Sequence, residues 1–244
     1  MKTEEQLTQL VSKLKKAAES NLLSVVLYGS AATDEFHPEH SDLNVLCILR
    51  DLGNKELGKL GAASTWWAKR GHPAPLFFTQ GELHRSADIF AIELLDIKAA
   101  RRVLYGEDVI AALDVPTERH RMQVEREFRN NTLRLRQHYV MLAGDSRKTL
   151  ELMLSSISTF AALFRHALLA LGEEPPTTKR ATLERAGAAL GFDPSPFHTI
   201  LDIREAHKRD RDVEIQATFD KYLNAIVKAT EEVDRRLAVP PASE

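Results

Sequence analysis

The sequence predicts an α/β (α+β) domain with a mixed sheet, followed by an all-α helical bundle. Short apolar runs alternate with helical patterns up to Pro116, and long helical periodicity follows it without a convincing strand. The composition, 43% apolar and 28% charged, is that of a globular protein with a sizeable core. We therefore expect a first domain at residues 1–115, a helical bundle at 116–238 and a tail at 239–244.

The first half of the chain is expected to hold four strands. Each is a short apolar run flanked by turn residues; they are predicted at residues 22–28, 42–49, 76–79 and 88–97. Helical spacing of apolar residues predicts helices at residues 4–19, 55–70 and 107–113. Thr79 followed by Glu82 predicts a capping box at the start of another short helix. Residues 98–105 form a further short element whose type stays open.

The second half is expected to consist of five helices. Their apolar residues recur with helical spacing, and Gly144, Gly172 and Gly191 fall at the breaks between them. The predicted ranges are residues 117–142, 147–171, 178–190, 195–207 and 213–237.

Charge and cysteine content limit the partners that we expect. The formal net charge is −2, so a general basic field for nucleic acid is absent and no nucleic-acid partner is predicted. Cys47 is the single cysteine and falls in a predicted strand, which indicates packing and a reducing compartment. No run approaches the ~18 apolar residues of a membrane span. We therefore predict a cytoplasmic protein that does not bind a membrane.

The residues best suited to chemistry lie at the ends of the first two predicted strands. Gly29 and Ser30 follow the first strand, where glycine allows a phosphate to approach the backbone and serine adds a hydrogen bond. Asp42 and Asn44 open the second strand, two residues apart, so their side chains are expected on one face. Oxygen ligands in this arrangement suit Mg²⁺ beside a phosphate.

This pattern of an apolar strand, Gly-Ser, a spacer and an Asp-x-(Asp/Glu) pair resembles the nucleotidyltransferase fold superfamily. DNA polymerase beta and the aminoglycoside nucleotidyltransferases belong to that superfamily, and a helical bundle after the catalytic domain is similar to its antibiotic-modifying and minimal members. The resemblance implies that the Gly-Ser turn holds a nucleoside triphosphate. It also implies two strand carboxylates and a third from a later strand, which bind two Mg²⁺ or Mn²⁺ ions.

This sequence matches the superfamily motif at some positions and departs from it at another. Gly29, Ser30 and Asp42 match, whereas Asn44 stands in place of the second carboxylate and is a weak metal ligand. We assign the third carboxylate to Glu93, because a charge within an apolar run is costly unless it binds something. Asp88 and Asp96 are the alternatives for this position, and a structural ion pair with an arginine is the alternative role for Glu93.

Two functions are consistent with these residues. The first is a nucleotidyltransferase that moves a nucleoside monophosphate from a nucleoside triphosphate to a hydroxyl of a small molecule or protein. The second is a catalytically impaired nucleotide-binding or interaction module on the same fold, which Asn44 favours. The sequence is compatible with a homodimer. Trp66 and Trp67 either form a stacking platform for a base or a ligand ring, or one packs in the core and the other lies at a domain contact.

Overall fold

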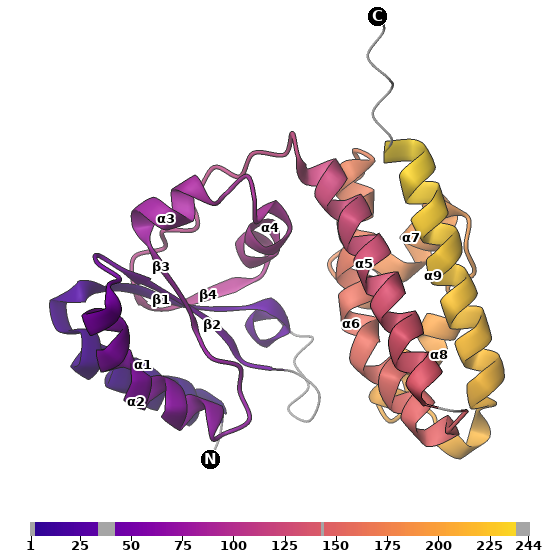
Figure 1. Ribbon diagram of the computed structural model, residues 1–244, viewed down its shortest axis with the longest axis horizontal. Helices are drawn as coiled ribbons and strands as arrows, with labels where there is room; N and C mark the ends of the chain where they lie inside the picture. Colours follow the sequence, from indigo (N-terminus) through magenta and orange to yellow (C-terminus); the bar gives the residue numbers. More distant parts are fainter. Residues whose placement is uncertain (1–2, 34–41, 143, 238–244) are drawn as a thin grey trace, which may run out of the picture. The chain divides into compact units, whose positions relative to one another are not determined.

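The chain folds into two compact units, Met1–Glu118 and Arg119–Glu244, drawn in Figure 1. The computed structural model describes residues 3–33, 42–142 and 144–237, so the predicted tail at 239–244 lies outside the described residues. The first unit combines a small sheet with helices, and the described part of the second is helical. This arrangement confirms the predicted fold class.

The sheet of the first unit is mixed, with four strands among the residues that the structure describes. Its strands are β1 (Leu22–Tyr28), β2 (Asn44–Leu49), β3 (Leu76–Thr79) and β4 (Arg101–Gly106). The spatial order is β3-β2-β1-β4, with β1 antiparallel to both neighbours and β2 parallel to β3. The residues of β1 and β2 are buried on both faces of the sheet, which explains the nearly continuous apolar sequences of these two central strands.

Helices cover the two faces of the sheet (Figure 1). The helices α1 (Thr3–Ala18) and α2 (Asn54–Ala68) pack on one face, where Leu14 and Trp67 join a core that includes Cys47. The helices α3 (Gln80–Arg85) and α4 (Ala91–Ala99) pack on the other, where Leu94 joins a core that includes Leu46. The side chains of β2 therefore alternate between two separate cores.

The start of α3 follows the sequence prediction closely. The Thr79 side chain accepts a hydrogen bond from the Glu82 amide at 3.2 Å. The Glu82 carboxylate accepts one from the Thr79 amide at 2.8 Å, which completes the capping box. The charge-stabilising hydrogen bonds from Thr79 lower the pKa of Glu82.

Two elements predicted around residue 100 are wrong. Residues 88–97 do not form a strand: α4 spans Ala91–Ala99, and Ala91, Leu94 and Ile97 bury one helical face. A short apolar run fits either a strand or a buried helix, and here the run forms a helix that buries one face. The fourth strand is instead β4, in the stretch whose type stayed open. The helix expected at residues 107–113 is also absent, because this segment forms turns.

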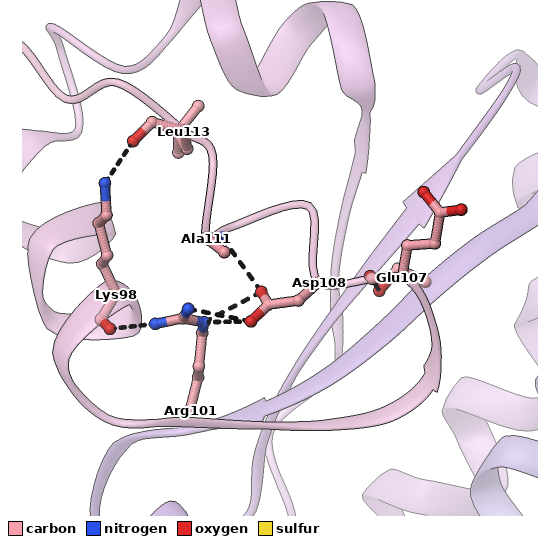
Figure 2. A network of polar contacts seen from close by, with 7 residues as sticks. Lys98, Arg101, Glu107, Asp108, Ala111 and Leu113 are labelled. Atoms are coloured by element: carbon pink, nitrogen blue, oxygen red, sulfur yellow. Dashed lines mark hydrogen bonds and ion pairs between the residues drawn. The ribbon is translucent and has the colours of Figure 1, made fainter.

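The turn after β4 is held by an ion pair and a required glycine. Figure 2 shows the Arg101 guanidinium between the carbonyl of Lys98 and the carboxylate of Asp108, which lies 2.9 Å from Arg101 Nη2. The hydrogen bond from Arg101 lowers the pKa of Asp108. Gly106 has a φ of +77°, and a Cβ there would lie 1.9 Å from the carbonyl oxygen of Leu23. A side chain at this position would therefore break the pairing of β1 with β4.

The second unit is a bundle built around one long apolar helix. Its helices are α5 (His120–Met141), α6 (Ser146–Ala170), α7 (Lys179–Leu190), α8 (Ser195–Arg204) and α9 (Ile215–Leu237). The central helix, α6, packs against the other four. Aromatic rings fill the space around it: Phe164 lies 5.5 Å from Phe128 and 5.4 Å from Phe197, measured between ring centroids. Gly191 ends α7 in the left-handed conformation, as the sequence predicts.

The length and composition of α6 also meet the criteria for a membrane-spanning helix. Of the helices in the described ranges, it is the one long and apolar enough by this test, and half of its most apolar window is buried in the bundle. This finding differs from the expectation that no segment approaches the length and apolar character of a membrane span. The core helix of a globular bundle passes the same test, and α6 has that place in this fold.

Candidate functional site

The first component of the site is the turn that follows β1. Gly29 has a φ of +78°, a conformation that glycine adopts without strain. Its amide donates a hydrogen bond to the carbonyl of Ala100 at 3.0 Å, and the Ser30 carbonyl accepts one from the Thr33 amide at 3.1 Å. The Gly29 amide is therefore already paired. Its part in anion binding would be close backbone approach rather than a free N–H group.

The second component is Asn44, the first residue of β2. The register pairs Asn44 with Tyr28, the residue before Gly29. A Cβ added to Gly29 would lie 3.5 Å from Asn44 Nδ2, so the amide nitrogen of Asn44 faces the Gly29 backbone. The structure thus brings together two of the residues that the sequence singled out, which lie on either side of residues 30–43 in the chain.

Asp42 lies just outside the strand in which it was expected. β2 begins at Asn44 rather than at residue 42, and the Asp42 side chain is exposed. Its charge acts on His72, whose pKa is lowered mainly by burial while Asp42 opposes that shift. His72 is itself fixed by a contact of 2.7 Å between its Nε2 and Gln6 Oε1. Asp42 is therefore close enough to His72 for their charges to interact.

Glu93 lies in the first turn of α4, and its placement on a strand was wrong. The pKa of Tyr28 is raised by burial and, to a smaller extent, by the charge of Glu93. Since Tyr28 precedes Gly29 and pairs with Asn44, this interaction places the Glu93 charge near the same end of β1. Glu93 is therefore carried by a helix rather than by the strand on which it was expected. Sequence reasoning missed Tyr28, for which its position directly before Gly29 was the available signal.

The two tryptophans on α2 have different surroundings. Trp67 is fully buried in the core, and its ring lies 4.2 Å from that of His72. Trp66 is partly buried, with the Arg70 guanidinium 3.7 Å and Lys13 Nζ 5.1 Å from its ring centroid. Cations of the same unit therefore lie against Trp66, and the packing role holds for Trp67.

The oxygen donors at this end of the sheet fit one divalent cation better than two. Within the described ranges, no group of three or more His, Cys, Asp or Glu side chains is arranged to hold a metal. Asp42 and Asn44 can offer one carboxylate and one amide oxygen, and Mg²⁺ accepts such a set when waters and substrate phosphates complete its shell. A two-ion clamp needs a second bridging carboxylate, and an amide with its nitrogen toward Gly29 does not supply it.

Comparison with known proteins connects this geometry to a fold. No family model matches the sequence, and no curated protein matches it. Among solved structures, the spectinomycin adenyltransferase AAD(9) of Enterococcus faecialis, solved with ATP and spectinomycin, matches with a TM-score of 0.58 and 15% identity. The match covers 96% of this chain and 100% of that one. This chain therefore shares its fold with AAD(9).

A second solved structure is more distantly similar. A nucleotidyltransferase-like protein of Exiguobacterium sibiricum 255-15 matches with a TM-score of 0.30 and 14% identity, over 96% of this chain and 74% of that one. A similarity at that level carries no structural argument, so the assignment of the fold depends on AAD(9).

Proposed function

We propose that this chain is a nucleotidyltransferase that moves a nucleoside monophosphate from a nucleoside triphosphate to a hydroxyl acceptor. The observation that best supports the proposal is the approach of Asn44 to Gly29 at the shared end of β1 and β2, with Asp42 directly before that end. AAD(9), whose fold this chain shares, was solved with ATP. We take a nucleoside triphosphate over from it as the substrate class.

In the proposed reaction, the oxygen of the acceptor hydroxyl attacks the α-phosphorus of the nucleotide. A new phosphorus–oxygen bond forms, the bond to the oxygen bridging the α- and β-phosphates breaks, and pyrophosphate leaves with that electron pair. The hydroxyl proton passes to a carboxylate, and we assign this role to Glu93 because its charge reaches Tyr28 beside the Gly29 turn. Gly29 and Ser30 would hold the triphosphate.

A divalent cation, Mg²⁺ or Mn²⁺, would compensate the negative charge of the phosphates during transfer. The Asp42 carboxylate and the Asn44 amide oxygen are the groups that would hold it. The donor set at this point is weaker than a pair of carboxylates, since an amide oxygen carries no net charge. We therefore propose a single ion that arrives with the nucleotide.

Calorimetry of ATP, GTP, CTP and UTP binding in the presence of Mg²⁺ tests the proposal. We expect at least one triphosphate to bind, and Asp42→Asn to weaken that binding by up to about tenfold. Asp51→Asn is the matched control, because Asp51 lies beyond the opposite end of β2 and its loss removes the same charge. If none of the four triphosphates binds to the wild-type protein, the proposal is wrong.

The second candidate function is nucleotide binding without transfer, and Asn44 is the observation that favours it. Radiolabelled ATP incubated with a panel of hydroxyl compounds and proteins separates the two. Label transfer with release of pyrophosphate supports the enzyme. Binding without transfer in the wild type, together with a gain of metal affinity in Asn44→Asp, supports the binding module.

A further inference from the structure

We infer that Asn44 acts as a hydrogen-bond donor to the phosphates, so that this chain binds a nucleoside triphosphate even without a divalent cation. The inference rests on the proposed nucleotide site and specifies how that site meets its ligand. It assigns the departure of Asn44 from the carboxylate pattern a positive role: the amide nitrogen adds a direct contact to the phosphates, and the amide oxygen stays available to the cation.

The geometry places the donor beside the expected phosphate position. The amide nitrogen of Asn44, rather than its oxygen, faces Gly29, at 3.5 Å from where a Cβ on Gly29 would stand. Gly29 has no side chain, so a ligand oxygen can approach the backbone there. The Gly29 amide already donates to the Ala100 carbonyl, so a phosphate at this turn needs another donor. Asn44 Nδ2 lies where it can be that donor.

The backbone fixes this donor in position. Asn44 is held by strand pairing with Tyr28, and Gly29 by its hydrogen bond to Ala100, the residue before β4. The donor and the turn are therefore held by the pairing of β1 with β2 and β4. The side chain of Asn44 is also half-buried. A donor that is already ordered loses little conformational entropy when the ligand binds.

The absence of charge on the Asn44 side chain also favours binding of the triphosphate without a cation. A carboxylate at position 44 would stand next to the triphosphate and repel it, so that binding would require a bridging cation. The neutral amide removes that repulsion and offers N–H groups to the anion, and hydrogen bonds to charged acceptors are the stronger kind. Asp42 remains as a negative group, but it lies outside the strand and is exposed to water, which screens its charge.

Calorimetry with ATP tests the inference, in EDTA and separately in Mg²⁺, with the full chain. We expect wild-type protein to bind ATP in EDTA within about tenfold of its affinity in Mg²⁺. In EDTA, Asn44→Ala should weaken binding about tenfold, since a hydrogen bond to a charged group is lost. Asn44→Asp should weaken it further, because repulsion is added, but should recover when Mg²⁺ is present.

The matched control is Asn54→Asp, at the first residue of α2. It makes the same change in charge within the same unit, but Asn54 is exposed and lies beyond the opposite end of β2 from Asn44. We expect it to bind ATP like the wild type in both conditions. Circular dichroism melting of each variant shows whether a loss of affinity reflects unfolding.

The possible outcomes separate the inference from the proposed function. If wild-type protein binds ATP in Mg²⁺ and loses it entirely in EDTA, the inference is overturned and the nucleotide site stands. Equal affinity of Asn44→Ala and wild type in EDTA also overturns it. An absence of ATP binding in both conditions overturns the inference for ATP, and the other triphosphates then decide whether the proposed function stands.

Discussion

His120 and His166 contact each other in the interior of the helical bundle, with 2.9 Å between His120 Nε2 and His166 Nδ1. His120 opens α5 and His166 lies in the last turns of α6, and both side chains are buried. Arg165 Nη2 approaches the other ring nitrogen of His166 at 3.5 Å. Because a guanidinium can only donate, His166 Nε2 accepts, which leaves its Nδ1 to donate to His120. This buried arrangement keeps the His120 imidazole neutral in the folded protein near pH 7.

This contact predicts that the protein loses stability in mild acid. Burial and the neighbouring His166 lower the pKa of His120 from 6.5 to about 4. Between these values the unfolded chain binds a proton that the folded chain rejects, so stability falls as the pH drops through this window. We expect a loss of about 2–3 kcal/mol from His120 between pH 7 and pH 4.5. Urea unfolding followed by circular dichroism at both pH values measures it.

A pair of variants isolates the contribution of His120. His120→Gln should reduce the pH dependence by about 2–3 kcal/mol, because the titrating group is gone. His138→Gln, a change of an exposed histidine on the same helix, should leave it unchanged. If both variants show the wild-type pH dependence, His120 does not titrate as its burial implies.

Gly106 predicts a large loss of stability when a methyl group is added. A Cβ at this position would meet the Leu23 carbonyl at 1.9 Å, in backbone that cannot move without disturbing β1. We expect Gly106→Ala to lower the free energy of unfolding by more than about 3 kcal/mol, or to prevent folding. Gly61→Ala is the control: its Cβ would meet nothing within 4 Å, and it should stabilise α2 by about 0.5–1 kcal/mol. Urea unfolding compares the two, and a mild effect at Gly106 would contradict the β1–β4 register.

Cys47 should be unreactive in the folded protein. Its side chain is fully buried, and burial raises the pKa of the thiol to about 12, so almost no thiolate exists at neutral pH. We expect an aromatic disulfide reagent to modify it only as fast as the first unit unfolds. Absorbance of the released thiolate, with and without urea, gives both rates. Rapid modification in native buffer would mean that the sheet opens far more readily than its packing implies.

The sequence predicted the elements whose local pattern agrees with their place in the fold. Residues 22–28 and 76–79 form the predicted strands, and the capping box at Thr79 is present. These signals are local: a continuous apolar run, or a side chain that reaches its own helix start. The strand expected at residues 88–97 failed for a non-local reason. Its apolar residues fit either period, and the position of β4 beside β1 decided the outcome.

The candidate site was predictable in its residues more than in its geometry. The order of Gly29, Ser30, Asp42 and Asn44 along the chain predicted the turn after β1, whereas β2 begins at Asn44, two residues later than expected. Neither the orientation of the Asn44 amide nor the pairing of the Gly29 amide with Ala100 could be predicted. Both depend on the register of three strands, and register is set by contacts between distant segments.

Glu93 gives a test of the site that does not depend on any ligand. Its charge contributes to the raised pKa of Tyr28, because ionising the phenol beside a carboxylate brings two negative charges together. Glu93→Gln should therefore lower the pKa of Tyr28 while burial keeps it above 10.0. Ultraviolet titration of the phenolate measures the shift, and Tyr28→Phe identifies the transition that belongs to this residue. Glu56→Gln, a change on α2 that removes the same charge, should leave it unchanged. An unaltered Tyr28 transition in Glu93→Gln would mean that Glu93 points away from the end of β1, and its proposed catalytic role would fall with it.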